Sequence, residues 1–194
     1  TNPTVGSLEN RLTELEDGAM CVALSSGTAS VMYSLINICS QGDNFITDTQ
    51  LYGGTFTMFT NILPEFGITS KKVDTTDLDL VEKSIDKNTK AIYVETITNP
   101  GLVVADIEGL SKVAHSKGIP LIVDATFTTP ALQKSLDFGA DIVVYSLTKW
   151  MSGHGRVIAG AVIEKGGFEW GNGNFPLYDT PDTSYGGMRW GHDL

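Results

Sequence analysis

Apolar residues along the chain alternate between helical spacing and short continuous runs rich in branched side chains. At the amino end, Leu8, Leu12 and Leu15 recur at helical spacing behind Ser7, which we take as the N-cap of a first helix that ends at Glu16. Apolar runs predict strands at residues 20–24, 44–47, 68–73, 91–95, 121–124, 142–145 and 157–163. Helical spacing predicts helices from about 28 to 41 and at 54–63, 77–85, 106–117 and 130–137.

Strands that alternate with helices are typical of βαβ units. We therefore predict an α/β fold with three layers, α/β/α, around a mostly parallel sheet. After Gly166 neither spacing continues, and Gly, Asn, Pro and aromatic residues dominate. We expect this last stretch to be an extended, turn-rich segment that docks on another domain or subunit.

Composition narrows the class of protein. Hydrophobic residues make up 41% and charged residues 19% of the 194 residues, which is typical of a soluble globular domain and not of a disordered chain. The formal net charge is −10, and no cluster of Lys or Arg interrupts it. Because phosphate binding needs local positive charge, we expect neither nucleic acid nor a membrane as a partner. No apolar run approaches the ~20 residues that span a bilayer.

The two cysteines, Cys21 and Cys39, each lie in an apolar stretch, and no Cys/His spacing suggests zinc. We expect buried thiols, no metal site and a reducing cytoplasm as the location. The chain opens with Thr1-Asn2-Pro3-Thr4 and not with Met, and it stops soon after a Gly-rich, aromatic-rich stretch. We therefore expect it to be an excerpt of a longer protein.

Ser26-Gly27-Thr28 stands between a predicted strand and a predicted helix. Free backbone N–H groups, hydroxyls and the positive end of the helix dipole would together suit a phosphate monoester, although an ordinary N-cap is the alternative that position alone leaves open. Neither GxGxxG nor GxxxxGK[ST] occurs, so dinucleotide and P-loop sites lack their usual support.

Polar residues also follow two apolar strands. Asp124 ends one of them, and Lys149 lies just beyond another, after Ser146-Leu147-Thr148. Ligands of open α/β sheets bind beyond the carboxyl ends of the strands. A desolvated lysine there can act as an amine nucleophile, and a carboxylate can pair with a pyridinium nitrogen. For Lys149 taken alone, a solvated surface role is the alternative.

A phosphate cradle, a strand-end Asp and a strand-end Lys are together the groups that pyridoxal phosphate requires. The lysine would bind the cofactor covalently, the acid would keep the ring nitrogen protonated, and the cradle would anchor the phosphate. Tyr52, in Leu51-Tyr52-Gly53-Gly54-Thr55, offers an aromatic face for stacking on the ring. The combination predicts pyridoxal 5'-phosphate as the cofactor.

These motifs, in this order and spacing, resemble the Cys/Met-metabolism enzymes that use pyridoxal phosphate. The matching stretches are Asn2-Pro3-Thr4, Leu8-Glu9, Ser25 to Ala29, Tyr52 to Thr55, Glu95 with Asn99-Pro100, Val123 to Phe127, Ser146 to Trp150 and Gly153-His154-Gly155. The resemblance implies the large domain of a fold-type I pyridoxal-phosphate enzyme. It covers residues 1–194 as one partial domain, without the family's N-terminal arm and C-terminal domain.

The resemblance also implies a role for each matching residue. Lys149 would carry the cofactor and move protons, Asp124 would hold the pyridine nitrogen, and Tyr52 would stack on the ring and assist at the leaving group. The other cofactor contacts would be Gly27, Thr28, Asn99, Thr126, Ser146 and Thr148, of which Asn99 would lie near the ring hydroxyl. Glu95 would shape the site and not act on substrate.

Within the family, residues 166–170, 175–176 and 181–187 resemble the stretch that O-acetylhomoserine sulfhydrylases carry after the cofactor lysine. This implies a γ-replacement that converts O-acetylhomoserine and sulfide to homocysteine and acetate. Methionine γ-lyase activity and cystathionine γ-synthase or γ-lyase activity remain alternatives, as does a catalytically incomplete, cofactor-free folding unit. The resemblance further implies an amino-acid substrate and a homotetramer built as a dimer of dimers.

The other candidate residues predict no chemistry of their own. We expect His115, His154 and His192 to be hydrogen-bonded or solvated, with no Ser/His/Asp set among them. Trp150, next to Lys149, is expected to serve packing.

Overall fold

One seven-stranded sheet organises the computed structural model, which describes residues 2–193. In chain order the strands are β1 (Met20–Leu24), β2 (Asn44–Asp48), β3 (Thr69–Val73), β4 (Thr89–Glu95), β5 (Leu121–Asp124), β6 (Ile142–Ser146) and β7 (Gly160–Glu164). Across the sheet their order is β1-β7-β6-β5-β4-β2-β3. β7 pairs antiparallel with β1 and with β6, whereas the other pairings are parallel. The predicted mostly parallel sheet is therefore confirmed.

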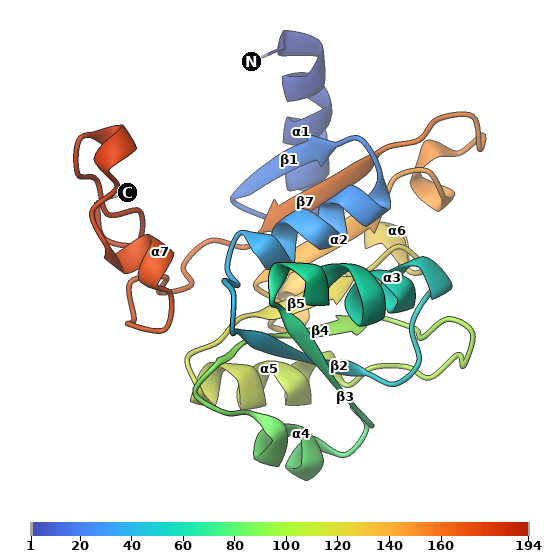
Figure 1. Cartoon of the computed structure of the whole chain (residues 1–194). Coiled ribbons are helices and arrows are strands. Elements are labelled where there is room, and N and C mark those ends of the chain that lie inside the picture. The colour runs from blue at the N-terminus through green and yellow to red at the C-terminus, as the bar shows by residue number, and fades with distance from the viewer. Residues whose placement is uncertain (1, 194) are drawn as a thin grey trace.

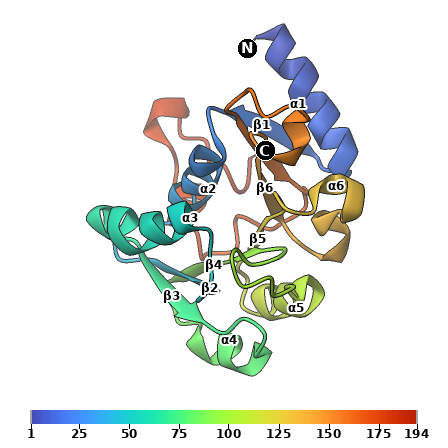
Figure 2. The same cartoon turned by 90° about the vertical axis from the view of Figure 1, so that its right-hand side faces the viewer.

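Helices cover both faces of the sheet (Figure 1). Those of the described chain are α1 (Pro3–Glu16), α2 (Gly27–Ile36), α3 (Gly53–Thr57), α4 (Leu78–Ser84), α5 (Ile107–Ser116), α6 (Thr129–Leu132) and α7 (Pro176–Asp179). Figure 2 shows α2 and α3 on one side of the sheet and α1, α4 and α5 on the other. The architecture is therefore the predicted three-layer α/β/α arrangement.

The core consists of two apolar clusters, one on each face. Alternation along β4 supplies both, since Ile92 packs in the cluster beneath α1 and α5 while Tyr93 packs in the cluster beneath α2. Both cysteines are free and buried, as expected, and burial raises the pKa of each thiol to about 12. No helix within residues 2–193 is long and apolar enough to cross a membrane.

The amino-terminal prediction is wrong about where the first helix begins. The helix starts at Pro3, because Asn2 caps it by accepting a hydrogen bond from the Thr4 N–H at 2.9 Å and Pro3 is preorganised for the first helical position. The apolar run 20–24 forms the expected strand, β1, but only Cys21 in it is buried. Met20 is 61% exposed because β1 is an edge strand with one face toward solvent.

Three other predicted elements differ in form. The helix expected at 54–63 is α3 followed by a π-helical stretch, Met58–Ile62, and a 3-10 helix, Leu63–Phe66. The helix expected at 130–137 is broken at Gln133, whose backbone is extended, so that the 3-10 helix Ser135–Phe138 can bury Leu136. The strand expected at 157–163 begins only at Gly160, where pairing with β1 and β6 starts.

The carboxyl-terminal segment docks in part on its own chain, whereas the expected contact with another domain or subunit stays a prediction. Phe168, Trp170 and Tyr178 pack against the cluster beneath α2, and Phe175 is only 1% exposed. The buried Lys90 side chain also donates a hydrogen bond to the Asn174 carbonyl at 2.6 Å. The segment is therefore part of this domain's core up to α7.

Candidate cofactor-binding site

A cavity of about 750 Å³ lies at the carboxyl ends of β4, β5 and β6. Every residue that the sequence assigns to catalysis or to the cofactor lines it: Gly27, Thr28, Tyr52, Asn99, Asp124, Thr126, Ser146, Thr148 and Lys149. The structure thus brings together groups that lie far apart in the sequence. Their roles toward a ligand stay predictions.

The first wall of the cavity is the amino end of α2. Ser26 caps this helix, since its Oγ accepts a hydrogen bond from the Ala29 N–H at 3.1 Å. A Cβ on Gly27 would lie 2.4 Å from the Ser146 Cβ, so only glycine lets the helix start reach the end of β6. The helix dipole therefore points its positive end at the Ser146 hydroxyl and the cavity.

The floor of the cavity carries Asp124. Its Oδ1 accepts the Thr126 N–H at 3.0 Å and its Oδ2 accepts the Tyr93 hydroxyl at 3.2 Å. Burial raises the pKa of this carboxyl above its usual value, although the bonds from Thr126 and Tyr93 act in the opposite direction. A cation in the cavity would favour the ionised form.

Two of the predicted cofactor residues also hold the strand ends together. Thr126 Oγ1 accepts the Ser146 N–H at 2.8 Å and so links the ends of β5 and β6. The Thr148 hydroxyl donates to the Ala159 carbonyl at 3.2 Å and accepts the Ala159 N–H at 3.1 Å. In this structure Thr148 therefore directs its hydroxyl proton to Ala159 and not into the cavity.

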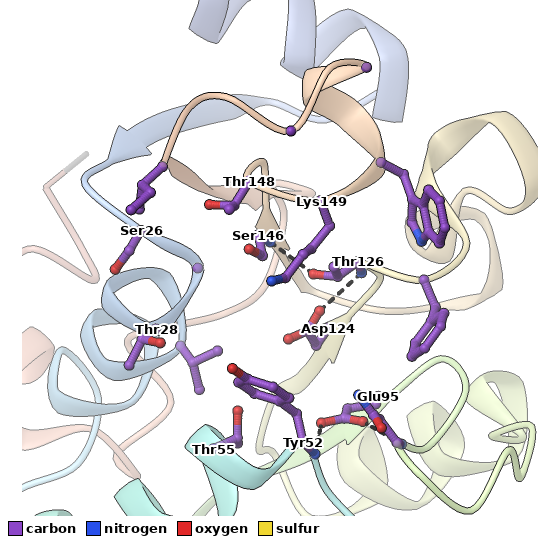
Figure 3. A pocket seen from close by; sticks show the side chains of 18 of the residues that line it. Ser26, Thr28, Tyr52, Thr55, Glu95, Asp124, Thr126, Ser146, Thr148 and Lys149 are labelled. Carbon is purple, nitrogen blue, oxygen red and sulfur yellow. Dashed lines mark hydrogen bonds between the residues drawn. The ribbon is translucent and has the colours of Figure 1, made fainter.

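Lys149 enters the cavity from the turn that follows β6. Its backbone N–H donates to the Ser146 carbonyl at 3.1 Å, which fixes the turn. Figure 3 shows its amine pointing into the same space as the Asp124 carboxylate and the Tyr52 ring. The expected desolvation of the side chain is wrong, because Lys149 is exposed to the open cavity.

The opposite wall is formed by Tyr52 and Asn99, and Glu95 lies between them. The Tyr52 ring is 48% exposed and points into the cavity (Figure 3). Glu95 Oε1 accepts the Tyr52 N–H at 2.8 Å, and Oε2 accepts the Asn99 N–H at 2.9 Å. Burial, with the negative charge of Asp124 nearby, raises the pKa of Glu95 to about 7.

Sequence reasoning missed several lining residues. Thr55, Phe127, His154 and Ile158 also line the cavity. Trp150 lines it too and is 66% exposed, so the expectation that it serves packing is wrong. The Tyr93 contact with Asp124 was missed as well. Alternation places Tyr93 and Glu95 on the same face of β4, but the bond to Asp124 also depends on how β4 pairs with β5.

A Ser/His/Asp set does assemble, contrary to expectation, at the amino ends of β5 and β6, which lie opposite the cavity. His115 Nε2 lies 2.8 Å from Asp141 Oδ2, and His115 Nδ1 lies 3.3 Å from Ser111 Oγ. However, the buried Ser111 hydroxyl donates to the Gly139 carbonyl, and Asp141 also accepts the Leu121 N–H. The arrangement links α5 to the starts of β5 and β6 and presents no free nucleophile. Residues 2–193 contain no cluster of His, Cys, Asp and Glu that could hold a metal ion.

The cavity's groups fit pyridoxal phosphate. The amino end of α2 with the Thr28 and Ser146 hydroxyls suits the phosphate, and Gly27 lets the helix start and Ser146 approach each other closely. The buried Asp124 carboxyl suits a protonated ring nitrogen, since such a partner would offset the desolvation of the carboxylate. Tyr52 offers a ring face, and Lys149 offers an accessible amine. Fold and site together define a pyridoxal-phosphate-binding domain of fold type I.

Comparison with known proteins agrees with this class. The sequence profile of the Cys/Met metabolism PLP-dependent enzymes matches residues 1–181, and the chain belongs to this family. It is 43% identical over 190 residues to homocysteine synthase of Schizosaccharomyces pombe, covering 96% of this chain and 44% of that protein. It is 48% identical over 163 residues to L-methionine gamma-lyase of Fusobacterium nucleatum, covering 84% of this chain and 41% of that protein.

A solved structure has nearly the same fold. The O-acetylhomoserine (thiol)-lyase of Campylobacter jejuni superposes with a TM-score of 0.96 at 40% identity, covering all of this chain and 49% of that one. That structure contains N'-pyridoxyl-lysine-5'-monophosphate. The chain thus spans about half the length, or less, of the relatives that it matches.

Proposed function

We propose that the protein catalyses a γ-replacement in which O-acetyl-L-homoserine and sulfide give L-homocysteine and acetate. The observation that carries the proposal is the convergence of Lys149, Asp124 and the amino end of α2 on one cavity. The names of the homocysteine synthase and the O-acetylhomoserine (thiol)-lyase to which the chain is similar support the substrate. Because the chain spans only part of those proteins, the activity is a proposal for the whole protein.

Each residue of the cavity has a task in this reaction. Bound pyridoxal phosphate supplies an electron-accepting ring that makes the substrate Cα proton removable. Asp124 would hold the positive charge at the ring nitrogen, and the amino end of α2 would hold the phosphate. Lys149 Nζ would bind the cofactor and would accept the substrate Cα proton without a diffusive encounter.

The overall change at the substrate balances without an oxidant. The Cγ–O bond breaks and acetate leaves with the bonding electrons, while the sulfur of HS⁻ forms the new Cγ–S bond. The Tyr52 ring would stack on the cofactor and its hydroxyl would assist proton transfer at the leaving group; the position of Tyr52 in the cavity wall supports both roles.

The second candidate function is γ-elimination from methionine. It is favoured by the 48% identity to a methionine gamma-lyase. The proposed removal of the Cα proton and loss of the γ substituent would be the same in both reactions. Cystathionine γ-synthase or γ-lyase activity and a catalytically incomplete domain are the further alternatives. The two main candidates differ in what happens after the γ substituent leaves.

Product analysis separates these functions. The protein is incubated with pyridoxal phosphate and either O-acetylhomoserine plus sulfide or methionine alone, and the products are measured by mass spectrometry. Homocysteine from the first mixture, absent with Lys149→Ala, is the expected result. Methanethiol and 2-oxobutyrate from methionine, without homocysteine from the first mixture, would assign the γ-lyase reaction. No product from either mixture, with a bound cofactor spectrum, would indicate an incomplete domain.

We further propose the setting in which the enzyme works. The substrate is an amino acid, and the full-length protein is a homotetramer built as a dimer of dimers in the cytoplasm. Free, buried thiols at Cys21 and Cys39 are compatible with a reducing compartment. Residues 1–194 would form one partial cofactor-binding domain. Light scattering of the full-length protein tests the assembly.

A further inference from the structure

Glu95 ends β4 and uses both carboxylate oxygens on two different loops. Oε1 accepts the Tyr52 N–H at 2.8 Å, and Oε2 accepts the Asn99 N–H at 2.9 Å. Tyr52 precedes α3, whereas Asn99 lies in the turn after β4. Both loops contribute lining residues to the cavity. One side chain therefore joins the two loops that form a single wall of the site.

The surroundings of Glu95 make a carboxylate costly there. The side chain is buried, with 5% exposed, and the acids Asp124 on β5 and Asp48 on β2 both disfavour its charge. Tyr93 on the same strand is buried beside these acids. A glutamine would avoid the charge, but its amide has only one acceptor oxygen and could not receive both N–H groups through separate oxygens. The double acceptance explains why an acid is suited to this position.

The same two bonds give Glu95 an indirect role at the site. Each oxygen accepts a backbone N–H and is thereby directed at one of the two loops. The side chain acts at the cavity through the residues that it holds. Charge-assisted bonds of this kind are stronger than bonds between neutral groups.

We propose that Glu95 is a positioning residue that fixes Tyr52 and Asn99 relative to each other, and thereby sets the orientation of the Tyr52 ring over the cavity. In the cofactor-bound protein, the fixed ring holds the pyridine ring in one orientation; this part rests on the proposed function. The fixed wall itself belongs to the cofactor-free chain and can be tested there.

The test compares Glu95→Gln with Asp141→Asn. Asp141 is a matched control because it is also a buried acid, 6% exposed, that accepts a backbone N–H, yet it lies at the opposite edge of the sheet. Amide hydrogen exchange is measured for the cofactor-free proteins at about pH 8, above the pKa of Glu95, with urea added so that all of them have the same free energy of unfolding. We expect exchange at Tyr52, Asn99 or both to rise about tenfold in Glu95→Gln, because one N–H loses its charged acceptor. Asp141→Asn should leave both amides unchanged and accelerate Leu121.

The second readout is the visible circular dichroism of added pyridoxal phosphate, which reports how the ring is held. Glu95→Gln should reduce this signal at saturating cofactor, and Asp141→Asn should not. Unchanged exchange at both amides overturns the proposal, and so does faster exchange with an unchanged dichroism signal. If the unsubstituted protein binds no cofactor, the proposed function fails, whereas exchange alone still decides whether Glu95 fixes the wall. Should Glu95→Gln not fold, Glu95→Asp is measured in the same way.

Discussion

Glu16 offers a quantitative test of how this fold handles a buried acid. It ends α1 and is fully buried, with 0% exposed. The Tyr145 hydroxyl donates to its Oε1, and its Oε2 has no hydrogen-bond partner within residues 2–193. Burial raises the pKa of Glu16 from 4.5 to about 7, although the Tyr145 bond and Lys134 lower it. The perturbation is Glu16→Gln, which keeps an oxygen for Tyr145 and removes the titration.

The sign and size of the effect follow from this pKa. Because the folded protein holds the proton more tightly than the unfolded chain, the contribution of Glu16 to stability is fully present below about pH 4.5 and is lost as pH rises to about 7. One pKa unit corresponds to about 1.4 kcal/mol, so the loss is on the order of 3 kcal/mol. Titrations shared by both proteins, including that of Glu95, cancel in the comparison.

The assay is urea unfolding of both proteins at several values of pH between about 4.5 and 8. We expect the free energy of unfolding of the unsubstituted protein to fall relative to that of Glu16→Gln by about 3 kcal/mol across this window. Glu14→Gln is the matched control, since Glu14 lies exposed on the same helix and its substitution should leave the pH dependence unchanged. Parallel curves for Glu16→Gln and the unsubstituted protein would refute the reasoning.

Two further substitutions test the cradle and the carboxyl-terminal segment. Gly27→Ala places a Cβ 2.4 Å from the Ser146 Cβ, so we expect the affinity for pyridoxal phosphate, measured by absorbance titration, to fall at least about tenfold. The control is Gly6→Ala, whose added Cβ meets no atom within 4 Å and should leave the affinity unchanged. Equal affinities would disprove the role of the close approach. Phe175→Ala removes a buried side chain, so it should reduce the free energy of unfolding by about 3–5 kcal/mol and make the chain cleavable by protease after residue 166. Leu177→Ala, at an exposed position, should do neither. A loss below about 1 kcal/mol in Phe175→Ala would show that the segment does not belong to the core.

Much of the site could be predicted from sequence because its groups stand at the ends of strands. Asp124 and Lys149 each follow an apolar run, and a parallel sheet brings such ends to one edge. The same reasoning applied to Ser26-Gly27-Thr28, since a strand, a glycine turn and a helix follow one another along the chain. These patterns involve only residues that are close together in the sequence, so one sequence is enough to recognise them.

What could not be predicted depends on register and on the exact path of the loops. The Tyr93 bond to Asp124 requires β4 and β5 to pair with Glu95 opposite Asp124, and periodicity does not fix that pairing. The set formed by Ser111, His115 and Asp141 depends in the same way on how α5 lies over the sheet. Similarly, aromatic residues after Gly166 indicate that the segment packs, but not that it packs on its own chain.

The most direct test of the central claim is to locate the cofactor on the chain. The protein is loaded with pyridoxal phosphate, treated with borohydride to make the attachment permanent, and digested for peptide mass mapping. We expect one modified residue, Lys149, and loss of the modification in Lys149→Arg, which keeps the positive charge without the reactive amine. Modification spread over other lysines, or retained in Lys149→Arg, would contradict it.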